Sequence, residues 1–296
     1  MPTFQSALIA LDLSAMDDTL LSYTDSMARI FDTEKIYCSH VVPVPFQLLD
    51  VGTRMVEPAE EDKAIFQRVR ERLTKEVEPY FKRLEPAIIT TQIEVTAGRA
   101  YKKILQMAEE KAINLLVLGK KPVSENSGLD AHRVARRAKC AVLFVPQQPA
   151  STINQIIVPL DYSEYSLRAL KAALAVKRQF KSTKITCVAV AEVLPPSYTM
   201  GNSYELIAAR AKEQIKYTHG KFLEQHLLED AELELVILDN TLLHTAEVIL
   251  EYAHQQTTDL IIMGAKGNSP FENFLYGSVT ERLVSMEKDF PVLVVR

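Results

Sequence analysis

The sequence predicts an α/β protein built from two tandem, doubly wound sheets, each with five parallel strands. Short, uniformly apolar segments alternate with amphipathic segments along the chain, and the pattern of residues 1–146 recurs in residues 152–296. Strands buried on both faces of a parallel sheet are apolar at successive positions, and alternation with helices implies right-handed βαβ crossovers. The length of 296 residues suits two domains of ordinary size.

Each half opens with an apolar strand that ends in an aspartate. Residues 7–11 lead into Asp12-Leu13-Ser14, and residues 156–160 lead into Asp161-Tyr162-Ser163. Because serine is a preferred N-cap, we expect Ser14 and Ser163 to begin the first helix of each half.

The remaining elements are expected in the same order in both halves. A second strand leads into a proline-bearing loop and a long charged helix, followed by a third strand, a third helix, a fourth strand ending in glycine, a fourth helix and a terminal strand. In the first half the strands are expected at 36–42, 88–95, 114–119 and 141–145, with helices at about 60–84 and 100–111. In the second half the strands are expected at 185–193, 233–238, 259–264 and 291–295, with helices at about 203–228, 243–255 and 280–286. Residues 147–151 form a short polar linker.

Composition excludes several classes of protein. The net charge of −4 lacks the basic excess of a general nucleic-acid binder, so no nucleic-acid partner is expected. No apolar stretch approaches the roughly 18–20 residues that span a bilayer, and residues 1–5 do not resemble a signal peptide. The three cysteines include no CxxC pair, which fits a reducing compartment. We therefore expect a soluble cytoplasmic protein that does not bind membranes.

The loop after the fourth strand of the second half has the composition of an anion-binding loop. Gly264 and Gly267 are followed, after nine residues, by Gly277-Ser278 at the start of a helix, so three of the chain's nine glycines lie here. Glycines let backbone N–H groups approach phosphate oxygens, and a helix N-terminus favours negative charge. Lys266 and the Ser278 hydroxyl add a cation and a donor. A flexible surface loop before a capped helix is the alternative, and neither GxxxxGK[ST] nor GxGxxG after a first strand occurs.

This glycine pattern resembles the ATP-binding motif of the universal stress protein family. The segments Val158-Pro159-Leu160-Asp161-Tyr162-Ser163 and 291–295 also resemble that family, and the resemblance covers nearly the whole chain as two tandem domains, residues 1–146 and 152–296. It implies a Rossmann-like fold of the adenine nucleotide alpha hydrolase type. It also implies that the second domain binds ATP, with Mg²⁺ as an optional companion, and that the protein is a stress-response regulator.

The resemblance also implies roles for individual residues of the second domain. Asp161 would accept a hydrogen bond from the nucleoside with Pro159 beside it, and Val193 would line the adenine pocket. Met263 and Gly264 would face the ribose. The phosphates would be held by Lys266, Gly267, Gly277, Ser278 and Val279. Without the resemblance, Asp161 reads as a helix-start residue, and Val193 and Met263 read as ordinary core.

The first half departs from the motif. Gly119 keeps the first glycine position, but Pro122 takes the second and so removes both an N–H donor and the flexibility of glycine. Ser127-Gly128 stands where the second half has Gly277-Ser278, and the loop is five residues shorter. We expect the first domain to keep the fold and to bind nucleotide weakly or not at all.

No catalytic or metal centre is predicted. Among the six histidines only His219 and His226 share a helix face, and they are about two turns apart. Glu272, inside the glycine loop, is the one acid near the phosphates by sequence, and it offers weak support for hydrolysis.

Three functions remain open: a nucleotide-sensing regulator, a slow ATP-hydrolysing enzyme, and an interaction scaffold that needs no nucleotide. In the resembled family the fifth strands pair across a two-fold axis. The terminal strands at 142–145 and 292–295 are apolar and would be adhesive if left unpaired. This predicts an intramolecular pseudo-dimer of the two domains, with a homodimer of chains as a further option.

Overall fold

The computed structural model of the chain describes residues 4–43, 60–81, 89–120, 131–192, 203–240, 244–267 and 276–296. These residues fall into two compact units, Pro2–Pro149 and Ala150–Arg296. Within the described residues, no helix is both long enough and apolar enough to cross a lipid bilayer.

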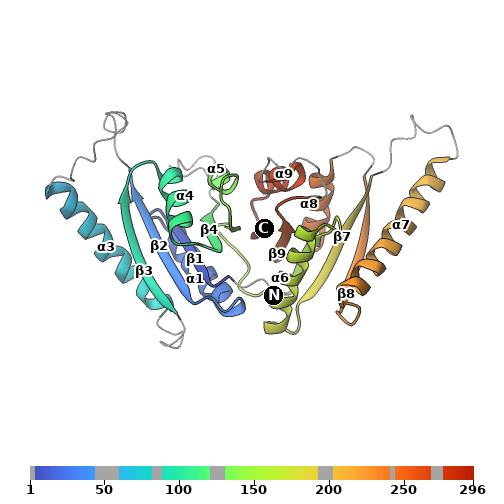
Figure 1. The fold of residues 1–296 in the computed structure, drawn as a ribbon, viewed down its shortest axis with the longest axis horizontal. Coiled ribbons are helices and arrows are strands. Elements are labelled where there is room, and N and C mark those ends of the chain that lie inside the picture. Colours follow the sequence, from blue (N-terminus) through green and yellow to red (C-terminus); the bar gives the residue numbers. More distant parts are fainter. Residues whose placement is uncertain are drawn as a thin grey trace. The chain divides into compact units, whose positions relative to one another are not determined.

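The N-terminal unit is built on a parallel sheet with the strand order β3-β2-β1-β4-β5. Helix α1 packs with α3, and α4 packs with α5. Figure 1 shows α3 running beside β3, an edge strand of this sheet. The bounds are β1 Ser6–Leu11, α1 Met16–Ile30, β2 Lys35–Val42, α3 Glu60–Phe81, β3 Thr90–Ala97, α4 Ala100–Glu110, β4 Leu115–Gly119, α5 Ala131–Ala135 and β5 Ala141–Val145.

The C-terminal unit repeats this topology with the order β8-β7-β6-β9-β10, again all parallel. Helix α8 packs with α9, and α7 runs beside β8 at the other end of this sheet (Figure 1). The two doubly wound sheets predicted from the sequence are thereby confirmed. The bounds are β6 Gln155–Pro159, α6 Glu164–Gln179, β7 Lys184–Glu192, α7 Ser203–Gln225, β8 Leu233–Asn240, α8 Thr245–Gln255, β9 Leu260–Gly264, α9 Ser278–Met286 and β10 Val292–Val295.

Each sheet has a topological switch point between its first and fourth strands. The chain moves from β6 outward through β7 and β8, then returns to place β9 on the opposite side of β6. The ladder between β6 and β9 contains only the pairs Ile156↔Leu260 and Ile157↔Ile261, so it stops before the carboxyl ends of the two strands. Ligands of doubly wound sheets bind at such a crevice. The glycine loop begins at this point.

Some element boundaries differ from the sequence expectation. β3, at Thr90–Ala97, both begins and ends two residues later than predicted, and β8, at Leu233–Asn240, ends two residues later. These edge strands are only partly buried, so they lack a continuous apolar pattern. Helix α7 ends at Gln225, three residues earlier than expected. Such shifts are usual at the ends of elements.

The two predicted N-caps have different outcomes. Ser163 caps α6, and its hydroxyl accepts a hydrogen bond from the Ser166 N–H. The prediction for Ser14 was wrong, because α1 has Ala15 as its N-cap and no side-chain cap. The Ser14 hydroxyl instead donates to Asp12 at 2.6 Å, and the Asp17 carboxylate binds the amides of this turn.

Candidate functional site

Asp161 organises the turn between β6 and α6. Its Oδ1 accepts hydrogen bonds from the backbone N–H of Ser163 at 3.1 Å and from the Ser163 hydroxyl at 2.6 Å. Between them, Tyr162 has a left-handed backbone with φ of 62°, which is uncommon for a bulky residue. The Tyr162 ring packs against Phe222 and His219 of α7, with ring centroids 5.5 and 6.0 Å away. Packing against α7 thus holds the aspartate-bearing turn in its unusual conformation.

The first part of the glycine loop lies directly against this turn. A Cβ added to Gly267 would collide with Oδ2 of Asp161. A Cβ added to Gly264 would come within 2.8 Å of the backbone carbonyl carbon of Tyr165. Both glycines therefore permit a close approach that any other residue would block. Close packing against the aspartate turn therefore explains why the first two positions of the motif are glycine.

The second part of the loop returns to the same place. The Gly277 N–H donates to the Ala265 carbonyl at 2.8 Å, and Gly277 lies beside Lys266 and Gly267. Gly277 is the N-cap of α9, which begins at Ser278. The buried Thr280 hydroxyl donates to the Gly264 carbonyl at 2.9 Å and so ties the first turn of α9 to the end of β9. The opening N–H groups of α9 are consequently presented beside Gly267 and Asp161.

The structure brings together most of the residues named from the sequence. Pro159 ends β6, Asp161 follows it, and the remaining members of the group lie at the end of β9 or the start of α9: Gly264, Lys266, Gly267, Gly277, Ser278 and Val279. Met263 is 3% exposed inside β9, so its side chain is part of the core. Val193 and Glu272 lie outside the described residues, and their expected roles stay predictions.

The corresponding turn of the N-terminal unit has the same backbone and different polar groups. Leu13 has φ of 63°, matching Tyr162. Asp17 is 3% exposed, and its carboxylate accepts hydrogen bonds from the N–H groups of Asp12 and Leu13 at 3.0 and 2.7 Å. In the C-terminal unit, Ser166 follows Asp161 in the sequence as Asp17 follows Asp12, and its hydroxyl donates to the Ser163 carbonyl. The N-terminal unit therefore carries an extra buried acid that is bound to its aspartate turn.

The pKa of Asp17 is raised to about 6, chiefly by burial; the two backbone hydrogen bonds lower it, and the neighbouring carboxylates of Asp12 and Glu76 add smaller increases. At pH 7 the side chain is mostly ionised. Its negative charge and its use of the turn amides make this turn less suited to a phosphate-bearing ligand than the turn at Asp161. The sequence interpretation did not single out Asp17, although alignment of the two aspartate turns pairs it with Ser166.

Two further features differ around the N-terminal turn. His40 of β2 is 9% exposed and its Nδ1 lies 3.0 Å from the Leu11 carbonyl oxygen, where the second unit has the smaller Ala189. A Cβ at Gly119 would lie 3.0 Å from the flexible Met16 side chain rather than against backbone. Pro122, Ser127 and Gly128, which define the altered loop in the sequence, lie outside the described residues.

The pair of histidines on α7 packs against aromatic side chains. His219 is buried against Tyr162, and burial lowers the pKa of its imidazole. His226 packs on Phe222, with ring centroids 4.9 Å apart. Both rings serve aromatic packing behind the aspartate turn.

The family is decided by comparison with known sequences. The model of the universal stress protein family matches residues 3–146 and, a second time, residues 152–296. The chain belongs to the universal stress protein family. Universal stress protein MJ0531 of Methanocaldococcus jannaschii is 30% identical over 144 residues, which cover 48% of this chain and 82% of that protein. Universal stress protein YxiE of Bacillus subtilis is 29% identical over 150 residues, which cover 48% of this chain and 99% of that protein.

Solved structures show the same tandem fold. This universal stress protein aligns over its full length with the crystal structure of a universal stress protein from Archaeoglobus fulgidus, covering 98% of that chain with a TM-score of 0.63 at 18% identity. A protein of unknown function from Pseudomonas aeruginosa, PA1789, aligns over 99% of this chain and 92% of that chain, with a TM-score of 0.61 at 14% identity. At these identities the likeness concerns the fold, and function must be argued from the site.

Proposed function

We propose that this stress-response protein binds ATP through its C-terminal unit and acts as a nucleotide-sensing regulator. The observation that carries the proposal is the convergence of Asp161, Lys266-Gly267 and Gly277-Ser278 at the switch point of one sheet. A carboxylate that can accept a hydrogen bond from a nucleoside lies beside a glycine-lined helix N-terminus that favours phosphate. Membership of the universal stress protein family supports ATP as the nucleotide, with Mg²⁺ as an optional companion.

The same comparison supports binding by one unit of the two. In the N-terminal unit, the Asp17 carboxylate accepts hydrogen bonds from the turn amides, and the His40 ring contacts the last residue of β1. Both features oppose a nucleotide that would place negative charge and a flat base in this crevice. We therefore propose one ATP per chain, bound between the carboxyl ends of β6 and β9.

The proposal is tested by identifying the nucleotide on the purified full-length chain. The protein is denatured, the released nucleotide is analysed by chromatography, and the stripped protein is titrated with ATP by calorimetry. We expect one ATP per chain. If no nucleotide co-purifies and ATP gives no heat of binding, the proposal is overturned and a scaffold is favoured. Time-dependent formation of ADP would instead favour an ATP-hydrolysing enzyme.

Gly277 offers a matched pair of variants for this test. A Cβ at Gly277 lies 3.6 Å from the Lys266 Cα, an ordinary contact, so a side chain fits here without displacing the loop. Gly277→Glu introduces a carboxylate where the phosphates are expected and should abolish measurable ATP binding. Gly277→Ala adds only the methyl group and should weaken ATP binding far less than Gly277→Glu does. Equal binding by both variants would place the phosphates elsewhere.

Assembly of the two units, and of one chain with another, stays a prediction. The apolar terminal strands β5 and β10 motivate it. Small-angle scattering of the full chain would contradict the expected pseudo-dimer if it showed two separated, independently moving units.

A further inference from the structure

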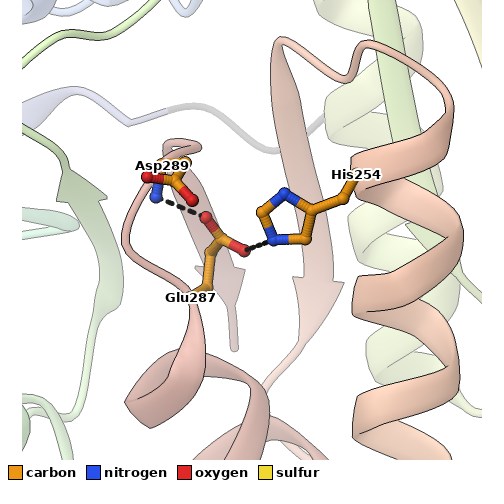
Figure 2. Close-up of side chains that lie close together, drawn as sticks. All are labelled: His254, Glu287 and Asp289. Carbon is orange, nitrogen blue, oxygen red and sulfur yellow. Dashed lines mark hydrogen bonds and ion pairs between the residues drawn. The ribbon is translucent and has the colours of Figure 1, made fainter.

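A second group of polar side chains lies in the C-terminal unit, at the opposite ends of the strands from the ATP loop. His254 is in the last turn of α8, Glu287 is the C-cap of α9, and Asp289 lies in the turn before β10. One ligand atom from each side chain lies within 4.8 Å of the others. Figure 2 shows the His254 ring and the Asp289 carboxylate on either side of Glu287. None of the three contributes to the site described above.

Glu287 is the buried centre of this group. It is 1% exposed, and its Oε1 accepts hydrogen bonds from the backbone N–H groups of Asp289 and Phe290 at 2.6 and 2.7 Å. Its Oε2 is also buried and accepts no hydrogen bond from any described residue. This oxygen lies 3.4 Å from Nε2 of His254, a contact that becomes an ion pair when the imidazole is protonated. A buried carboxylate oxygen without a hydrogen bond is costly, and a cation beside it removes the cost.

The other two side chains lie on the solvent side of this buried carboxylate. The His254 side chain is 47% exposed, and its ring packs on Phe290 with centroids 4.7 Å apart, which orients the imidazole toward Glu287. Asp289 is exposed. An ion can therefore enter from solvent and keep water as additional ligands. The carbonyl ends of α8 and α9 add negative potential at the same place.

The N-terminal unit provides an internal comparison. Counting from the matched fourth and fifth strands, His254 corresponds to Glu109, Glu287 to Arg137 and Asp289 to Lys139. There, Nζ of Lys139 forms an ion pair with Oε1 of Glu109 at 3.0 Å. This position of the fold thus carries basic side chains in the N-terminal unit and three potential metal ligands in the C-terminal unit.

We propose that His254, Glu287 and Asp289 bind a divalent transition-metal ion of the Zn²⁺ class. One imidazole nitrogen and two carboxylate oxygens form a donor set that suits Zn²⁺ and its neighbours, whereas Mg²⁺ and Ca²⁺ prefer oxygen ligands alone. The ion would sit beside Glu287 Oε2 and join the end of α8 to the turn that leads into β10. The ATP site is not involved, so this proposal and the proposed function stand or fall separately.

The test is a calorimetric titration of the metal-stripped, full-length protein with Zn²⁺ under reducing conditions. Two near-isosteric variants of exposed side chains, His254→Gln and Asp289→Asn, keep the fold and each remove one ligand. We expect each to weaken one equivalent of Zn²⁺ binding by at least about 10-fold, the lower end of the loss caused by removing even a supporting contact. Circular dichroism of each variant verifies the fold.

Glu109→Gln is the matched control, because it removes a carboxylate from the same helix position in the other unit. It should bind Zn²⁺ as the unmodified protein does. The proposal is overturned if His254→Gln and Asp289→Asn also bind Zn²⁺ with unchanged affinity, which would assign any binding to the cysteines or other histidines. Binding of Mg²⁺ as tight as that of Zn²⁺ would overturn the assignment to the transition-metal class.

Discussion

The turn after β1 and the turn after β6 have almost the same backbone, with Leu13 at φ of 63° and Tyr162 at φ of 62°, yet they present different chemistry. In the N-terminal unit, the Asp17 carboxylate accepts hydrogen bonds from the turn amides. In the C-terminal unit, Ser166 holds that place and Gly267 lies against Asp161. The comparison teaches that the unusual backbone belongs to the fold, while a few side chains around it decide what can bind.

The same contrast recurs at the other end of the strands. The Lys139–Glu109 ion pair of the first unit occupies the place where the second unit gathers His254, Glu287 and Asp289. The four predictions below test how far the difference between the units depends on single residues in and around the aspartate turns.

The largest effect is expected from Gly267→Ala, which makes the second unit resemble the first at the position of Pro122. The new methyl group would collide with Oδ2 of Asp161 and displace the carboxylate from the loop. ATP affinity should fall by about 100-fold, equivalent to one or two hydrogen bonds to charged groups at about 1.5–3 kcal/mol each. Calorimetry measures this, with Gly277→Ala as control. An affinity within about 3-fold of the unmodified protein would show that close approach here is unnecessary.

Asp17→Asn tests the buried acid of the first unit through the pH dependence of stability. The folded-state pKa of about 6 exceeds the ordinary aspartate value of 3.8, so the folded protein binds more protons between these values. Stability should therefore decline as pH rises from about 4 to about 6, by about 2–3 kcal/mol, and Asp17→Asn should lack this decline. Urea unfolding at pH 4 and pH 7 measures the difference.

The control for this experiment is the same substitution at Asp230, an exposed residue. It should leave the pH dependence unchanged. If Asp17→Asn and the unmodified protein lost stability in parallel between pH 4 and pH 7, the Asp17 carboxylate would not carry the effect.

Gly264→Ala and Gly119→Ala compare the fourth strands of the two units. The first methyl group would meet Tyr165 backbone at 2.8 Å, whereas the second would meet the Met16 side chain at 3.0 Å. Backbone cannot yield as a methionine side chain can, so we expect a loss of about 2 kcal/mol for Gly264→Ala and less than about 1 kcal/mol for Gly119→Ala. Denaturant unfolding measures both losses. Equal losses would contradict the difference in packing.

The smallest effect is expected from Ser166→Asp, which moves the buried acid of the first unit into the second. Two unit charges separated by about 10 Å repel by about 1–2 kcal/mol at an effective dielectric constant near 20, so with a separation of that order ATP should bind about 10-fold more weakly at pH 7. Ser166→Ala, which removes the hydroxyl without adding charge, is the control. Equal ATP affinities for the two variants would mean that charge at this position does not distinguish the units.

Much of the fold was predictable because burial on both faces of a parallel sheet imposes continuous apolar strands. This pattern located β1, β4, β6 and β9 almost to the residue, and it placed the predicted aspartate and glycine positions at the carboxyl ends of those strands. The edge strands β3 and β8 were placed less accurately, since their partial burial leaves a weaker pattern.

The sequence by itself determined the repeat, the sheet type and the glycine motif, because each depends on residues close together in the chain. Only the tertiary structure decided that Asp17 binds the amides of its turn, that Gly267 lies against Asp161, and that His254 meets Glu287. These contacts depend on a left-handed turn residue and on where helices end against the sheet. Such geometry is set by packing among distant segments, and no spacing of residue types along the chain records it.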